Sequence, residues 1–139
     1  MKSSIDVALH FLKFRSRSVF EVKQKLKEKK YSEKEIEETI EVLTRNKLLD
    51  DAEFARMWVG DRNRFKPSGS FLLRLELRQF GIDEQIIEEK LLDLNEEELA
   101  KKALEDKGRY RNAESQKQAQ FLQRRGFSTS VIYKIIKDK

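Results

Sequence analysis

The sequence predicts an all-α protein made of three tandem three-helix repeats that form an elongated, curved, solenoid-like molecule. Apolar residues recur at helical spacing along most of the 139 residues, and one Pro and five Gly leave few positions that interrupt a helix. The apolar pattern also repeats along the chain, as in proteins whose units stack on their neighbours. We expect the repeats to occupy residues 1–49, 50–94 and 95–139.

The repeat is visible as columns of apolar residues. Leu26, Leu77 and Leu122 occupy equivalent places, 51 and then 45 residues apart. The unequal spacing puts extra length in the middle repeat, much of it around Pro67. Further apolar columns follow the leucines five, ten and fourteen positions later: Tyr31, Ile82 and Phe127; Ile36, Ile87 and Ile132; Ile40, Leu91 and Ile136.

The first repeat is expected to contain three short helices. Apolar residues spaced by three and four predict a helix over residues 4–14. Ser18 with Glu21, and Ser32 with Glu35, have the spacing of capping boxes, so a helix is expected to begin after each serine. Helices of this length are not stable alone in water, and each must therefore pack against the other two.

The second repeat is expected to open with a longer helix. Asp50 has the position of its N-cap, and Glu53 three residues later would complete a capping box. Phe54, Met57 and Trp58 then fall on one helical face, because residues three and four apart are neighbours on a helix.

A bend is expected at residues 66–70, the only stretch that contains Pro. Gly81 offers a left-handed C-terminal cap to the helix after the bend, and Asp83 caps the next helix. The apolar side of the helix after the bend is assigned to Phe71, Leu72, Leu75 and Phe80.

The third repeat is expected to hold helices at about 96–109, 112–125 and 129–137. Asn95, with Glu98 three residues later, forms a capping pair at its start. A glycine separates the last two helices, as is common at helix C-termini.

Composition places the chain among folded, soluble proteins. Charged residues make up 40% and hydrophobic residues 38%, and nine Phe with regularly spaced Leu and Ile argue against disorder. No apolar run approaches the roughly 18 residues needed to cross a bilayer, and the N-terminus lacks the apolar segment of a signal peptide. The absence of Cys fits a reducing compartment. We expect a monomeric cytoplasmic protein that is not bound to membranes.

Positive and negative residues are segregated along the chain, whose net charge is +5. Residues 13–30 hold eight basic and two acidic residues, residues 83–98 hold eight acidic residues and one Lys, and residues 107–139 hold nine basic and two acidic residues. This pattern fits an acidic partner, although charged helix faces are often only solvated. The last helix is basic, unlike the third helices of the other repeats, and carries Lys134, Lys137 and Lys139.

The sequence offers almost no catalytic chemistry. Its single His, His10, stands among apolar residues and is expected to be a packing or surface residue. There is no glycine-rich phosphate loop, no His pair at metal-binding spacing and no Gly-flanked Ser. A helix cap explains Asp50, and stabilisation of the helix dipole explains Asp51. We therefore expect no enzymatic activity, no cofactor and no metal.

Two clusters of basic residues remain as candidates for contact with a partner. Both have the chemistry to bind nucleic-acid phosphates, and the last two residues of the second cluster are expected to be exposed. A helix-turn-helix arrangement stays open, but nothing in the sequence marks a helix that reads bases. The candidates are Arg56, Arg62, Arg64, Lys66, Arg74 and Arg78 in the first cluster, and Arg109, Arg111, Lys117, Arg124 and Arg125 in the second.

Three motifs run through the first two repeats: Arg17-Ser18-x-x-Glu21-Val22-x-x-Lys25-Leu26, Leu49-Asp50-Asp51-x-x-Phe54-Ala55 followed by Val59 and Arg62, and Glu76-Leu77-x-x-x-Gly81-Ile82. Together they resemble the RecX family, bacterial regulators of the RecA recombinase, and the resemblance covers nearly the whole chain. Two places differ: Pro67-Ser68-Gly69 stands where the family usually has Gly-Pro, and Phe80 stands where it commonly has Lys.

The resemblance implies a three-repeat helical protein that binds RecA and lies in the groove of the RecA–DNA filament. It implies that the protein limits filament growth and suppresses the ATPase, strand-exchange and co-protease activities of RecA. Binding to DNA alone is expected to be weak and sequence-independent. The alternative is a helical nucleic-acid-binding protein that represses transcription or shields DNA without RecA. The structural positions of the family motifs are Leu49, Asp50, Asp51, Phe54, Ala55, Leu77 and Gly81.

Overall fold

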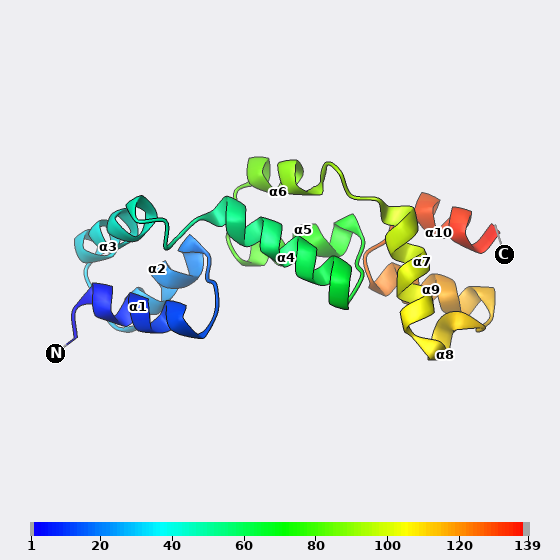
Figure 1. Cartoon of the computed structure of the whole chain (residues 1–139), viewed down its shortest axis with the longest axis horizontal. Coiled ribbons are helices and arrows are strands. Elements are labelled where there is room, and N and C mark those ends of the chain that lie inside the picture. Colours follow the sequence, from blue (N-terminus) through cyan, green and yellow to red (C-terminus); the bar gives the residue numbers. More distant parts are fainter. Residues whose placement is uncertain (1, 138–139) are drawn as a thin grey trace.

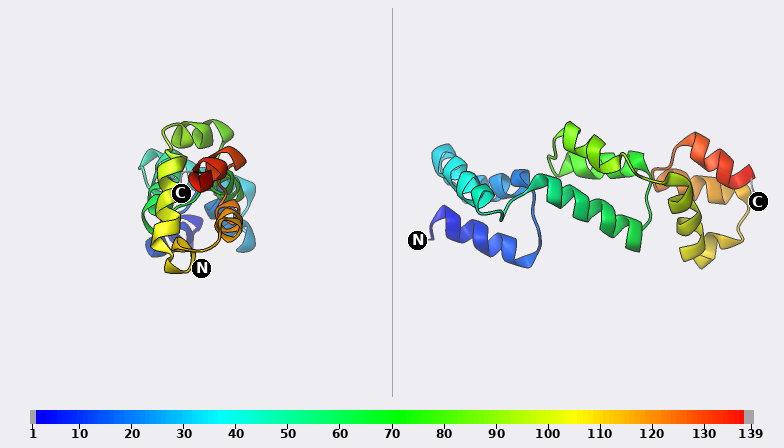
Figure 2. Two further views of the ribbon diagram at one scale, coloured as in Figure 1. Left: turned by 90° about the vertical axis from the view of Figure 1, so that its right-hand side faces the viewer. Right: turned by 45° about the horizontal axis from the view of Figure 1, so that its top comes forward.

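The computed structural model describes residues 2–137, which form ten helices and no strand (Figure 1). The helices form three groups that follow one another along the long axis, with α1 and α10 in the groups at opposite ends of the molecule (Figures 1 and 2). The predicted all-α, elongated array of three units is confirmed. None of these helices is long and apolar enough to cross a membrane. Unit 1 holds α1 (Ser4–Phe14), α2 (Val19–Glu28) and α3 (Glu33–Arg45); unit 2 holds α4 (Asp51–Phe65), α5 (Ser70–Gln79) and α6 (Glu84–Leu91); unit 3 holds α7 (Glu96–Asp106), α8 (Gly108–Arg111), α9 (Ser115–Arg124) and α10 (Thr129–Lys137).

Each unit has its own hydrophobic core. The predicted column of Leu26, Leu77 and Leu122 supplies one fully buried residue to each core. In unit 3 the buried residue of α10 is Ile135, while Ile132 is only partly buried. Leu94 packs against the cores of both unit 2 and unit 3. The cores are therefore nearly separate, and the units meet at two small junctions that combine hydrogen bonds with close packing of Phe20 on Gly81 and of Leu72 on Gly126.

The apolar face of α5 differs from the prediction. Leu73 and Leu77 are completely buried, whereas Phe71 is 62% and Leu75 is 52% exposed. Residues two positions apart in the sequence are about 200° apart around a helix. The predicted Phe71 and Leu75 each stand two positions before the buried Leu73 and Leu77, so the predicted apolar face lies on the opposite side of α5. In α4, Phe54 is buried as expected, but Met57 lies 41% exposed at the edge of the same face.

The helix limits of unit 3 also differ from the prediction. α7 ends at Asp106, the short α8 follows, and α9 begins at Ser115 rather than near 112. The buried amide of Gln118 donates hydrogen bonds to the carbonyls of Tyr110 at 2.7 Å and Arg111 at 3.2 Å. These bonds tie α9 to the last residues of α8 across the turn between them.

The predicted helix caps are largely confirmed. Ser18–Glu21 and Ser32–Glu35 form complete capping boxes. Asp50 accepts a hydrogen bond from the Glu53 N–H at 3.1 Å, as an N-cap should. The capping box expected there is wrong, because the Glu53 carboxylate accepts from the Arg56 guanidinium instead of the backbone.

The junction between units 1 and 2 places the N-terminus of α2 against two elements of unit 2. The first helical N–H, that of Val19, donates to the Asp51 carboxylate at 2.9 Å. The preceding hydroxyl, that of Ser18, donates to the Phe80 carbonyl at 2.7 Å. Asp51 therefore caps a helix of the neighbouring unit in addition to lying in the first turn of its own helix.

The junction between units 2 and 3 repeats this arrangement. The first N–H of α5, that of Ser70, donates to the Glu96 carboxylate at 2.7 Å. The preceding residue, Gly69, donates its N–H to the Arg125 carbonyl at 2.7 Å. The donors Val19 and Ser70 differ by the same 51 positions as the predicted repeat, and the acceptors differ by the same 45.

A glycine completes each junction. Gly81 and Gly126 follow the accepting carbonyls, and both have positive φ, +73° and +85°. A Cβ atom on Gly81 would lie 2.4 Å from Cβ of Phe20, and one on Gly126 would lie 2.4 Å from Cβ of Leu72. Only glycine fits both the left-handed backbone and the close approach of a side chain from the preceding unit.

We predict that Asp51→Ala lowers the free energy of unfolding by about 0.5–2 kcal/mol at pH 7, because the Val19 N–H loses its cap. Asp51→Asn keeps an oxygen acceptor and should cost less.

Burial raises the pKa of the Asp51 carboxyl above its ordinary value of 3.8. The wild type should therefore lose stability relative to Asp51→Asn as pH rises from 3.8 through the raised pKa. Urea denaturation at several pH values measures this, and equal pH profiles for the two proteins would contradict it.

We predict that Gly69→Ala destabilises the junction of units 2 and 3. The new Cβ would lie 2.3 Å from the Gly126 carbonyl oxygen, a backbone atom that cannot rotate away. A cost of about 1–3 kcal/mol is expected, as for overpacked interiors. Gly60→Ala is the control, since its Cβ meets nothing within 4 Å and should be neutral or stabilising. Equal thermal midpoints for the two variants would show that Gly69 does not need to be glycine.

Candidate functional surface

The arginines predicted as contacts in unit 2 are mostly engaged within that unit. In three pairs the hydrogen bond from the guanidinium also lowers the pKa of the glutamate. These side chains lie at the surface, so the pairs add little to stability. The pairs are Arg56 with Glu53 at 2.5 Å, Arg74 with Glu88 at 2.8 Å, and Arg78 with Glu84 at 2.5 Å.

Arg62 belongs to a half-buried network that joins α4 to α5. Its guanidinium pairs with the Glu76 carboxylate at 2.5 Å and lies 4.9 Å from the ring centre of Trp58. The Trp58 indole N–H donates to the same carboxylate at 3.1 Å. The charge of Arg62 is thus used to hold two helices together.

Arg64 and Lys66 lie at the exposed C-terminal end of α4. Neither forms an ion pair with any carboxylate between residues 2 and 137. The Arg64 guanidinium lies 5.6 Å from the ring centre of Phe65, which is 75% exposed. Of the first predicted cluster, these two cations therefore keep their charge available.

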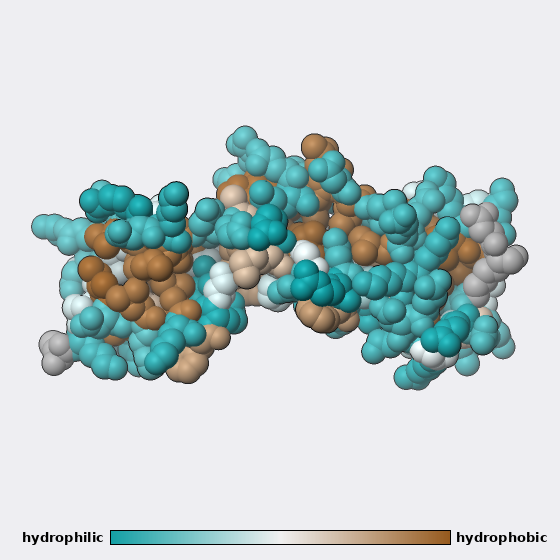
Figure 3. Space-filling view, viewed as in Figure 1, coloured by the Kyte–Doolittle hydropathy of each residue, from teal (hydrophilic) through white to brown (hydrophobic). Residues whose placement is uncertain are grey.

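The second predicted cluster is divided by the structure. Arg109, Lys117 and Arg124 line one open groove of about 580 Å³ in unit 3, together with a single carboxylate, that of Glu114. The Arg124 guanidinium donates to the Tyr110 hydroxyl at 3.1 Å, which holds it at the groove. Hydrophilic residues dominate this end of the molecule in Figure 3. Arg111 does not line the groove, and its guanidinium instead donates to the Glu105 carbonyl at 2.8 Å.

The prediction that Arg125 is exposed is wrong. Its relative exposure is 9%, its guanidinium donates to the Pro67 carbonyl at 2.9 Å and lies 4.9 Å from the ring centre of Phe121. Burial lowers the pKa of this guanidinium. Arg125 is the residue whose carbonyl accepts from Gly69, so its side chain is enclosed by the junction of units 2 and 3.

The basic end expected for α10 is also partly neutralised. Lys134 pairs with the Glu97 carboxylate at 3.1 Å. Lys137 lies over the Tyr133 ring, 5.8 Å from its centre, and Lys139 lies outside the described residues. The groove beside α9 is therefore the place in unit 3 where three of the predicted cations meet.

The motif positions have structural roles in this chain. Asp50 caps α4, Asp51 caps α2 and Gly81 closes the first junction. Leu49 belongs to the core of unit 1 and Phe54 to that of unit 2. Four of the seven motif residues are buried: Leu49, Phe54, Ala55 and Leu77.

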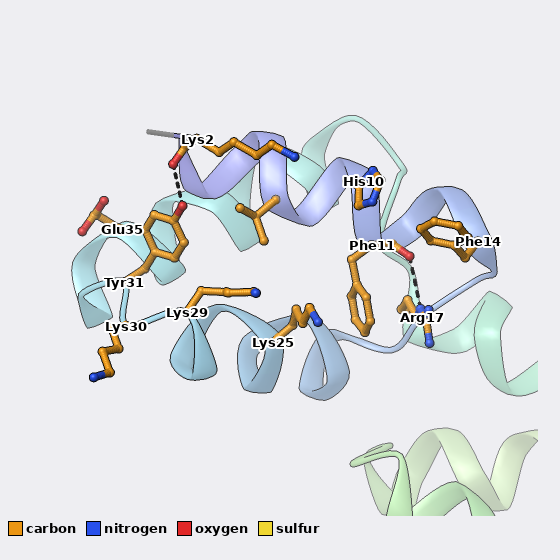
Figure 4. A pocket seen from close by; sticks show the side chains of 11 residues that line it. Lys2, His10, Phe11, Phe14, Arg17, Lys25, Lys29, Lys30, Tyr31 and Glu35 are labelled. Atoms are coloured by element: carbon orange, nitrogen blue, oxygen red, sulfur yellow. Dashed lines mark hydrogen bonds between the residues drawn. The ribbon is translucent and has the colours of Figure 1, made fainter.

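One basic groove was missed by sequence reasoning, although the excess of positive charge in residues 13–30 was visible. It lies between α1 and α2 and is lined by cations and aromatic side chains (Figure 4). The sequence separates these residues into two helices and a connection, and their meeting depends on how the helices pack. No group of three or more His, Cys, Asp or Glu positioned for a metal occurs in the described part of the chain.

Comparison with protein families gives three consecutive matches. The first, second and third three-helix domains of RecX match residues 5–43, 50–91 and 95–136. The chain belongs to the RecX family. The three RecX domains correspond to the three packed units, and the family resemblance found in the motifs is confirmed.

Curated RecX relatives support the assignment. The regulatory protein RecX of Chlorobium limicola is 34% identical over 93% of this chain and 84% of its own length. That of Chlorobium phaeobacteroides is 46% identical over 66% of this chain. The match spans 61% of the length of the Chlorobium phaeobacteroides protein and 53% of a RecX protein from Geobacillus.

Solved RecX structures share the fold. The crystal structure of RecX from Lactobacillus salivarius has a TM-score of 0.84 at 27% identity and covers 97% of this chain and 93% of its own. A second crystal structure of a regulatory protein RecX has a TM-score of 0.79 at 31% identity, over 98% of this chain and 70% of its own. The coverage includes all three RecX units, so their relative arrangement is shared as well.

We predict effects of very different size on stability for Arg124, the last residue of α9, and Arg125, its C-cap. Arg125→Ala should lower the free energy of unfolding by about 1.5–3 kcal/mol, because it removes a charged donor from a buried carbonyl. Arg124→Ala should change it by less than about 0.5 kcal/mol, because that side chain is exposed. Urea denaturation monitored by circular dichroism measures both, and equal effects would show that Arg125 does not stabilise the junction.

Proposed function

We propose that this protein is a non-enzymatic regulator of the RecA recombinase that binds the RecA–DNA filament. On this proposal it limits filament growth and lowers the ATPase, strand-exchange and co-protease activities of RecA. The observation that carries the proposal is that the RecX match extends through all three units, including both junctions. The resemblance to RecX supplies RecA as the partner.

The shape of the molecule supports binding along a filament. Three units in a row, joined by repeated junctions, form a long body rather than a globule (Figure 1). Such a body can lie along a helical groove and contact more than one RecA subunit. Because each unit contacts mainly its neighbour, small adjustments at two junctions can fit the body to the pitch of the filament.

The distribution of free cations indicates where filament phosphates would be contacted. Arg109, Lys117 and Arg124 meet at one groove in unit 3, whereas most arginines of unit 2 are paired with glutamates. Such cations recognise phosphates without reading bases, so the DNA contribution should be sequence-independent and weaken with salt.

The alternative is a nucleic-acid-binding protein that acts without RecA. The basic grooves of units 1 and 3 favour keeping it as a second candidate. Footprinting of the protein alone on duplex DNA separates the two functions. A protected sequence that survives scrambled competitor DNA at physiological salt supports the alternative, and inhibition that requires RecA filaments supports the proposal.

We predict that the protein inhibits the ATPase of RecA on single-stranded DNA and that Lys117→Glu/Arg124→Glu weakens this inhibition, most strongly at low salt. Lys101→Glu/Lys107→Glu is the control, because both lysines are exposed in the same unit and lie outside the groove. The measurement is the ATPase rate with each protein titrated in.

Three results of this experiment are informative. No inhibition by the wild type would contradict regulation of RecA. Equal inhibition by the wild type and the groove variant would contradict a role for the unit 3 groove, while leaving regulation itself intact. Equal weakening by the two double variants would mean that net charge, rather than the groove, governs inhibition.

A further inference from the structure

The two junctions share one geometry but differ in how many places they hold. Between residues 2 and 137, the hydrogen bonds that cross the first junction all lie at the start of α2, at Ser18 and Val19. Unit 3 holds the start of α5 in the same way, and Phe71 adds a further N–H bond to the Gly126 carbonyl at 3.1 Å. Unit 3 also holds the end of α4 and the bend that precedes α5.

The end of α4 is held by a lysine of unit 3. The Lys102 ammonium group, on α7, donates to the carbonyls of Asn63 at 2.9 Å and Arg64 at 3.2 Å. The last carbonyls of a helix have no partner within it, so this ammonium satisfies two acceptors and fixes α4 against α7. Met57 stands 45 residues before Lys102, at the equivalent place in unit 2, and a thioether cannot donate a hydrogen bond. The end of α1 therefore receives no such donor from unit 2.

The bend before α5 is held by an arginine of unit 3. The Arg125 guanidinium donates to the Pro67 carbonyl at 2.9 Å, and this hydrogen bond is buried. Phe80 stands 45 residues before Arg125, at the equivalent place in unit 2. A phenyl ring has no donor for a carbonyl, so the second side-chain clamp is also missing from the first junction.

The corresponding acceptors of unit 1 are served from within unit 1. The carbonyl of Ser16, which is the repeat equivalent of the proline in the bend, accepts from the Arg15 guanidinium at 2.8 Å. The Phe11 carbonyl, one of the last of α1, accepts from the Arg17 guanidinium at 3.3 Å. Arg15 contacts unit 2 through the Phe80 ring, 5.7 Å from its centre, and such a cation–π contact is less directional than a hydrogen bond.

The chain segments that connect the units differ in the same sense. Leu94, between α6 and α7, packs against the cores of both units that it joins. Its equivalent 45 residues earlier, Leu49, is buried in the core of unit 1 and is not among the residues packed on the core of unit 2. From Leu49 the chain reaches α4 through the extended residue Asp50, whose φ is −157° and whose ψ is 101°. Hinges commonly consist of a few such residues next to a helix end.

We infer that units 2 and 3 form one rigid body and that unit 1 is hinged to it at the first junction. Small interfaces between units permit relative motion unless several contacts hold them. Opening the first junction breaks hydrogen bonds at one helix start. Opening the second breaks hydrogen bonds at three separate places, two of which use a charged donor.

The hinge gives the two ends of the molecule different freedom. Unit 1 can change direction while unit 2 and the groove of unit 3 keep their separation. Most of the adjustment expected along a filament then falls on the first junction. The hinge is a property of this chain alone and goes beyond the proposed regulation of RecA.

The motion is tested by pulsed electron double resonance between pairs of nitroxide labels. The chain has no Cys, so introduced cysteines are the only thiols to be labelled. Glu38→Cys/Glu89→Cys spans the first junction and Glu89→Cys/Glu105→Cys spans the second, and all three positions are exposed on helices. The first pair should give the broader distribution of distances. Equal widths, or a broader second pair, would overturn the inference.

The clamp is tested by Lys102→Met, which gives unit 3 the residue found at the equivalent place in unit 2. It should broaden the distribution of the pair that spans the second junction. Lys101→Met is the matched control, because Lys101 is an exposed lysine of the same helix and should leave the distribution unchanged. Thermal melting verifies that both variants are folded. No broadening by Lys102→Met, or equal broadening by both variants, would contradict the role of the clamp in the rigid body.

Amide hydrogen exchange followed by NMR measures the same difference without any substitution. The Val19 N–H should have a protection factor about 10-fold lower than that of the Ser70 N–H, because opening the first junction breaks fewer contacts. Equal protection of the two amides would also overturn the hinge. Because no assay contains RecA, failure here is distinct from failure of the proposed regulation.

Discussion

The structure depends on one repeated hydrogen bond, in which a carboxylate of one unit caps the first N–H of a helix in the preceding unit. Asp51 does this for α2 and Glu96 for α5. The first N–H groups of a helix have no partner within it, so an acceptor supplied from the next unit both satisfies a donor and fixes its direction. Because the cores are nearly separate, this bond, the adjacent hydrogen bond to a backbone carbonyl and the close contact at the glycine together place neighbouring units.

The two junctions reach the same geometry with different side chains. At the first, the Ser18 hydroxyl reaches the Phe80 carbonyl. At the second, Gly69 has no side chain and brings its own N–H to the Arg125 carbonyl, so the units approach more closely. The Arg125 side chain is enclosed where the two units meet, and this is why Arg125 is buried although the sequence predicted that it would be exposed.

The sequence was sufficient for the fold because the apolar columns and serine caps are local signals. Leu26, Leu77 and Leu122 could be aligned before their burial was known, and two capping boxes could be read from spacing alone. The functional surface was less predictable. Whether an arginine is free depends on which glutamate lies one helix away, and Arg74 and Glu88 are fourteen residues apart. The unit 1 groove likewise exists only because α1 and α2 pack with their cations facing each other.

Pairing of charge divides the molecule into regions with different capacities for binding. In unit 2 the guanidinium groups of Arg62, Arg74 and Arg78 bridge α5 to its neighbouring helices, so an anionic partner would have to compete with glutamates already in place. At the grooves of units 1 and 3 most of the lining cations form no ion pair with a carboxylate of residues 2–137, so an anionic partner would not have to displace one there. Two free grooves at the ends of a rod, separated by a paired middle unit, can hold two points of one extended anionic partner, with the junctions setting their separation. If both grooves are occupied together, the second contact forms at high effective concentration, so weak individual sites are enough for firm attachment.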